Sequence, residues 1–166
     1  MKKTFICIAL LALLVSCNGN SKTIDIPISK THCSYTFSTP YFDYDPRTYE
    51  NIVIEHIDEE VLFIVNESTD LIDLDYAKEY IGEFVEKAYL FAEIEGIEVN
   101  VDDEEYDDDY QKLIYYMRID VKNLDFEALN KLENKLNTGL IIDVYKNYTL
   151  GDYITSMEEE GWECKR

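Results

Sequence analysis

The chain has 166 residues, 46% of them hydrophobic and 13% aromatic, and a formal charge of −20. This apolar and aromatic content excludes a disordered acidic tail, and the length suits one domain with a workable core. The negative charge repels nucleic acid phosphates and anionic lipid headgroups, and it attracts basic proteins and divalent cations. Nucleic acid is therefore excluded as a partner.

The first twenty residues have the layout of an export signal. Met1-Lys2-Lys3 precedes an unbroken apolar stretch over residues 5–15, and polar residues begin at Asn18. Eleven apolar residues are too few for a membrane-spanning helix, which needs about 20. The segment therefore predicts a cleavable signal peptide.

The sequence Leu14-Val15-Ser16-Cys17 resembles the lipobox of bacterial lipoproteins. In that family the cysteine thiol receives a diacylglyceryl group, signal peptidase II cuts before it, and the freed amine is often acylated. The resemblance covers residues 1–20 and implies a lipid-anchored protein of the bacterial cell envelope. Asn18 replaces the aspartate that favours the inner membrane in the enterobacterial sorting rule, so the outer membrane is favoured.

Cleavage would divide the chain into a signal peptide of residues 1–16, a lipidated tether of residues 17–30, and a single acidic α+β domain of residues 31–166. The signal holds two of the 15 basic residues and none of the 35 acidic ones, so the mature chain carries 13 against 35, net −22. Its membrane contact is expected through the lipid on Cys17, and a basic protein is its candidate partner.

Two cysteines remain once Cys7 leaves with the signal and Cys17 takes the lipid. Export makes a disulfide between Cys33 and Cys164 feasible, and it would tie the two ends of the domain. Two unpaired thiols are the alternative, because a bridge requires Cα atoms within about 7 Å.

Hydrophobic periodicity predicts the elements in chain order. Irregular structure over residues 35–49 precedes a hairpin of strands 51–57 and 61–66. The expected elements that follow are a helix (75–95), strands (97–101 and 113–121), a helix (124–137), a strand (140–146) and a third helix that opens at a capping box at Thr149 and ends at Gly161.

From residue 61 to 146 this order is strand, helix, strand, strand, helix, strand, which is typical of a ferredoxin-like βαββαβ core. We expect an α+β domain with that core, an extra N-terminal strand or hairpin and a C-terminal helix. Both core helices would cover one face of the sheet. The opposite face would then carry a candidate binding surface of Tyr116, Arg118, Asp143 and Tyr145. An ordinary solvated sheet face is the alternative.

An acidic run follows the strand at 97–101, and its carboxylates are the hard oxygen ligands that Ca²⁺ prefers. The candidate ligands are Asp102, Asp103, Glu105, Asp107 and Asp109. The run lacks the glycine and the ligand spacing of an EF-hand loop, which favours a solvated hairpin loop with at most weak cation binding. No other cofactor or metal site is expected.

No catalytic residues are assigned. The two histidines have no metal-ligand spacing, and the chain has no Gly-x-Ser-x-Gly nucleophile elbow or glycine-rich phosphate loop. We expect a non-enzymatic binding module, in its sharpest form an immunity or inhibitor protein against a basic toxin or hydrolase. The alternatives are a structural or accessory envelope lipoprotein and a glycan-active enzyme that works through paired carboxylates.

Overall fold

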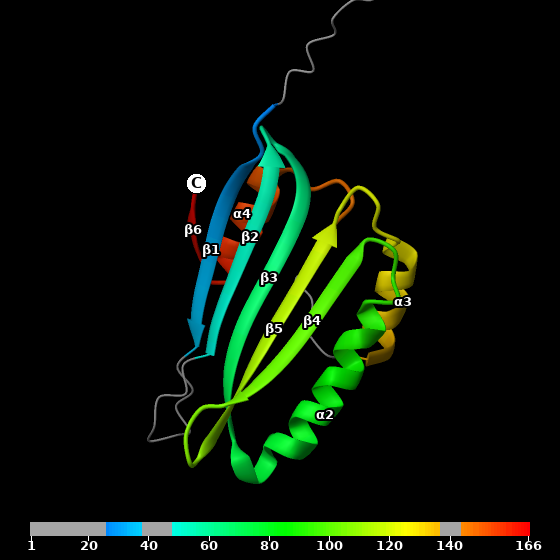
Figure 1. The fold of residues 1–166 in the computed structure, drawn as a ribbon. Coiled ribbons are helices and arrows are strands. Elements are labelled where there is room, and N and C mark those ends of the chain that lie inside the picture. Colours follow the sequence, from blue (N-terminus) through cyan, green and yellow to red (C-terminus); the bar gives the residue numbers. More distant parts are fainter. Residues whose placement is uncertain (1–25, 38–47, 137–143) are drawn as a thin grey trace, which may run out of the picture.

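The computed structural model describes residues 26–37, 48–136 and 144–166 (Figure 1). Within them the chain forms an α+β fold with a six-stranded antiparallel sheet and three helices. The elements are β1 (Ser29–Phe37), β2 (Thr48–Ile57), β3 (Glu60–Asp73), α2 (Leu74–Phe91), β4 (Ile97–Glu105), β5 (Tyr110–Asp120), α3 (Phe126–Leu136), α4 (Leu150–Glu159) and β6 (Glu163–Lys165). None of the helices in these residues is long and apolar enough to cross a membrane.

The strands lie in the order β4-β5-β3-β2-β1-β6, and every neighbouring pair is antiparallel. The 14-residue β3 begins with the apolar run Val61–Val65 and pairs with β2 on one edge and with β5 on the other. The β2–β3 turn passes through Asp58 with φ 51°, a left-handed conformation that aspartate tolerates better than most residues. The sheet is thus assembled around β3.

All three helices pack on one face of the sheet. Alternate residues of the strands supply the sheet side of this core, including Ile54 of β2, Ile64 of β3 and Met117 of β5, each at most 1% exposed. The same cluster contains buried side chains of every helix: Ala88, Phe91, Leu129, Leu150, Tyr153 and Met157. The fold has two layers, and the second face of the sheet carries none of these helices.

The ferredoxin-like βαββαβ core is not confirmed, because the sheet is larger. The expected arrangement holds for β3, α2, β4 and β5, since β5 lies between β3 and β4. In the ferredoxin-like order, however, the last strand would pair with the free edge of β3, and β2 occupies that edge. Residues 140–143 of the predicted strand lie outside the described residues, and residues 144–146 are not in a strand.

Several predicted boundaries were wrong and one strand was not predicted. β3 ends at Asp73 and not at residue 66, and α2 ends at Phe91 and not at residue 95. β1 begins inside the predicted tether and runs into the segment predicted as irregular. β4 extends four residues into the acidic run, as far as Glu105. The short β6 follows Gly161, whose φ is +96°, and was not predicted. Each of these strand segments is held in the sheet by a partner strand, which local periodicity does not reveal.

Candidate functional site: the open face of the sheet

We call the helix-free side of the sheet the open face. Side chains alternate between the two faces of a strand, so the registered pairs place one residue from every strand in each row across the sheet. One row is Lys165, His32, Val53, Val65, Arg118 and Glu98; the next is Glu163, Ser34, Asn51, Glu67, Tyr116 and Asn100. A hollow of about 560 Å³ lies over these rows and is lined by residues of β1, β2, β3, β5 and β6.

Arg118 is held in place on this face by two neighbours. Its guanidinium carbon lies 3.6 Å from the centroid of the Phe63 ring on β3, a cation–π contact. Its Nη2 lies 3.8 Å from Oε2 of Glu55 on β2, while Oε1 of Glu55 is 2.7 Å from Nζ of Lys30 on β1. The distance of 3.8 Å is too long for a hydrogen bond. The Arg118 donors therefore remain largely available, and 29% of its side chain is exposed.

The four predicted surface residues do not all meet. Tyr116 and Arg118 lie on the open face, both half-buried. Tyr145 lies in the turn before α4, where its ring stacks on Tyr148 with centroids 4.2 Å apart. The Tyr153 hydroxyl accepts a hydrogen bond from the Tyr145 N–H and donates one to the Tyr145 carbonyl, so Tyr145 belongs to a turn rather than to the sheet. Asp143 lies outside the described residues.

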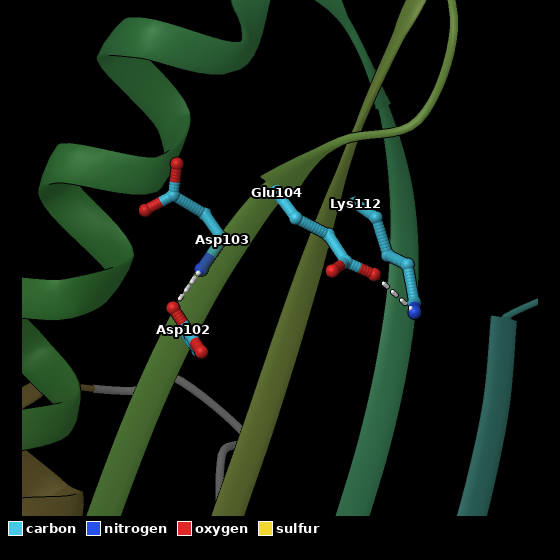
Figure 2. Close-up of polar contacts among 4 residues, drawn as sticks. All are labelled: Asp102, Asp103, Glu104 and Lys112. Carbon is cyan, nitrogen blue, oxygen red and sulfur yellow. Dashed lines mark hydrogen bonds and ion pairs between the residues drawn. The ribbon is translucent and has the colours of Figure 1, made fainter.

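The acidic run does not converge on one point. Asp102 and Glu104 of β4 lie on the open face, Asp103 on the other side of the strand (Figure 2). Nζ of Lys112 lies 2.6 Å from Oε1 of Glu104, and the Asp103 N–H donates to Oδ1 of Asp102 at 3.0 Å. In the hairpin turn, Oδ1 of Asp107 accepts the backbone N–H groups of residues 109 and 110. No group of three or more metal-ligating side chains occurs in the described ranges.

A disulfide joins Cys33 of β1 to Cys164 of β6, with Cα atoms 4.0 Å apart. The two residues face each other directly in the strand register. Cys33 is 1% exposed and points into the helix side of the sheet. Residues 163 and 165 therefore point the other way, and the bridge holds the charges of Glu163 and Lys165 at the hollow.

A buried histidine and a half-buried glutamate lie on the helix side, away from the hollow. His56 is 8% exposed, and its Nδ1 lies 2.8 Å from the Asp58 carbonyl oxygen, so Nδ1 is the protonated nitrogen. Nε2 lies 3.2 Å from the Thr31 hydroxyl, which donates to it. Glu50 is half-buried near Asp70; burial first, and then the charge of Asp70, raises the pKa of the Glu50 carboxyl.

The chain was compared with known protein families, curated proteins and solved structures. No family model matches the chain, and no curated protein matches it. A protein from Streptococcus pneumoniae TIGR4, solved by NMR, has a similar structure. The TM-score is 0.50, with 15% identity over 84% of this chain and 86% of that one. At this identity the likeness shows the fold alone.

Sequence reasoning found two residues of the hollow and missed the rest. Tyr116 and Arg118 stand out because they alternate with buried residues on one strand. Lys30, Glu55 and Lys165 come from three other strands, and only the pairing of those strands brings them to the same hollow as Arg118. In the sequence, these three residues stand out only as polar residues within β-branched or cysteine-containing segments.

Proposed function

We propose that this protein is a bacterial envelope lipoprotein, anchored through lipid on Cys17, that binds another protein without catalysing a reaction. In its sharpest form the proposal is an immunity or inhibitor protein against a basic toxin or hydrolase. The observation that carries the proposal is the open face, a sheet surface free of the three helices with a shallow hollow across five strands.

The residues of the hollow suit a protein partner. Tyrosine and arginine are enriched in protein interfaces and dominate their energetics, and here Tyr116 and Arg118 lie side by side on one strand. Val53 and Val65 supply an apolar strip between charged groups. An apolar centre with a charged rim is the usual composition of such an interface.

The charge of the mature chain supports a basic partner at longer range. A net −22 accelerates the approach of a cationic protein and lowers the rate for anionic ones. Many acidic groups lie outside the hollow, on the exposed side of α2 and on β4: Glu79, Glu83, Glu86, Asp102, Asp103, Glu104 and Glu105. Their field would guide the partner rather than contact it.

The lipid would keep the open face near the membrane. Eight residues lie between Cys17 and Ile26, the first described residue, so the connection has nine Cα-to-Cα steps. Fully extended, such a segment spans at most about 32 Å. A toxin or hydrolase that acts on the membrane or the cell wall would therefore be met close to its target.

Site-specific photo-crosslinking in the native bacterium tests the binding face. A photoreactive residue is placed at Asn51, which is exposed in the hollow, or at Glu86, which is exposed on α2. We expect a discrete protein adduct from position 51 and little or none from position 86. Equal adducts from both positions, or none from position 51, would reject the open face as the binding surface.

A further inference from the structure

We infer that the partner presents a carboxylate to Arg118 and a basic side chain to Glu67. This inference rests on the proposed function and names the chemistry of the partner surface. It differs from a simple attraction between an acidic lipoprotein and a basic protein. In that simpler case, every positive charge removed from the hollow would strengthen binding.

Charged residues occur in a definite order along the strands of the open face. Arg118 and Lys165 lie in one row of the open face, and Glu67 and Glu163 lie in the next. Neighbouring rows are two residues apart, about 7 Å along a strand. Within the described chain neither Glu67 nor Lys165 forms an ion pair. The first row also contains Glu98, opposite Arg118, and so carries two cations and one carboxylate, whereas the next row carries two carboxylates and no cation. This difference in net charge between adjacent rows favours a partner whose charges are arranged in the complementary order.

The guanidinium of Arg118 is supported by an aromatic ring but only partly neutralised by its carboxylate neighbour. Phe63 supports its guanidinium at 3.6 Å, which reduces the entropy that the side chain loses when it binds. Glu55 does not neutralise it fully, because that carboxylate lies 3.8 Å from Arg118 and only 2.7 Å from Lys30. A planar guanidinium with available donors matches a carboxylate in two parallel hydrogen bonds.

Positive and negative side chains are equal in number in the lining of the hollow. Its lining contains three cationic residues (Lys30, Arg118 and Lys165) and three carboxylates (Glu55, Glu67 and Glu163). This balance stands out in a mature chain of net charge −22. The excess negative charge therefore lies outside the hollow, and the contact surface itself calls for both signs on the partner.

The test repeats the Asn51 crosslinking with charge-reversal variants of the full-length lipoprotein, in cells suspended in one buffer of low ionic strength. Arg118→Glu and Glu67→Lys each reverse one charge of the hollow. Lys78→Glu and Glu79→Lys make the same charge changes on exposed positions of α2 and serve as matched controls. Arg118→Gln adds a neutral variant, and thermal unfolding of each purified protein reports whether it is folded.

We expect Arg118→Glu and Glu67→Lys to reduce the adduct at least about tenfold, Arg118→Gln to reduce it less, and both controls to keep it. A stronger adduct with Arg118→Glu or Arg118→Gln would overturn the inference in favour of a uniformly basic partner surface. An unchanged adduct would overturn it as well. If the protein with unaltered charges gives no adduct at Asn51, the proposed function itself fails, and that result is distinct from the other two.

Discussion

Gly96 joins α2 to β4 with φ +90°, and a Cβ atom added there would lie 2.8 Å from Cα of Leu124. Both the backbone conformation and the contact exclude a side chain. We expect Gly96→Ala to lower the free energy of unfolding by about 2 kcal/mol or more. The loss is measured as a lower urea concentration at the unfolding midpoint, with the slope of the unfolding free energy against urea concentration unchanged.

Gly82 is the matched control, because it lies in α2 with nothing within 4 Å of an added Cβ atom. Alanine has the higher helix propensity, so Gly82→Ala should raise stability by about 0.5–1 kcal/mol. If the two substitutions shifted the urea midpoint alike, the close approach of Gly96 to the backbone of Asn123 and Leu124 would not be the cause.

The raised pKa of Glu50 predicts that the stability of the protein depends on pH. Burial and the nearby charge of Asp70 raise the pKa of its carboxyl above 4.5, so the folded protein keeps the proton to a higher pH than the unfolded chain does. Stability is therefore lost as the pH rises through the raised pKa. Glu50→Gln removes this loss, so the variant should have the higher melting temperature at pH 7.

The advantage of Glu50→Gln should disappear below pH 4.5, where the wild-type carboxyl is protonated in both states. Thermal unfolding at both pH values measures the difference, and Glu86→Gln on the exposed side of α2 is the control. A stability gain for Glu50→Gln that is the same at both pH values would contradict this account.

Single residues were predictable where their signal is local. Thr149 forms the predicted capping box, in which its hydroxyl accepts the Asp152 N–H and the Asp152 carboxylate accepts the Thr149 N–H. Trp162, just after α4, packs on the core, and its ring centroid lies 5.5 Å from that of Tyr35. Arg118 could be assigned a face of the sheet, but not its contact with Phe63, which depends on the pairing of β3 with β5.

Whole elements follow the same rule. α2 and β5 have long periodic patterns and were predicted within a few residues. β6 has three residues, too few for a pattern, and exists because β1 offers it a pairing edge. β1 interrupts a polar segment, and its pairing with β2 outweighs that composition. Elements made by distant partners were therefore the ones that sequence reasoning missed.

The disulfide that links β6 to β1 is expected to stabilise the folded protein. Cys33 and Cys164 are 131 residues apart, and on chain entropy alone closing so long a loop contributes at most about 5 kcal/mol. The double variant Cys33→Ser/Cys164→Ser should lose about 2–5 kcal/mol in urea unfolding. Reduced wild-type protein should match it. Wild-type and double-variant curves that coincide under oxidising conditions would show that the bridge does not contribute.

At the scale of the whole molecule, the class of fold was predictable and the topology was not. Periodicity identifies strands and helices, and their order suggested a ferredoxin-like sheet. The free edge of β3 could pair with β2 or with a later segment. β2 occupies this edge, and it is joined to β3 by a two-residue turn. A short connection closes at a lower entropy cost than a long one, which favours β2.

The proposed lipid anchor at Cys17 is tested on the full chain. Cys17→Ser should abolish labelling with palmitate and release the protein from the membrane fraction, because a hydroxyl does not form the thioether. Cys7→Ser, within the apolar part of the predicted signal, should leave both unchanged. Membrane retention and labelling of Cys17→Ser would show that attachment does not use this cysteine.

The position of β1 also determines how the domain would respond to mechanical load. The chain enters β1 at Ser29, and β1 pairs with β2 over nine registered residues (Figure 1). A pull directed along β1 would load these pairs together in shear instead of peeling them apart in turn. The covalent link from Cys33 to Cys164 carries part of the same force into the C-terminal segment. A domain held by its N-terminus would thus resist extension at its first strand.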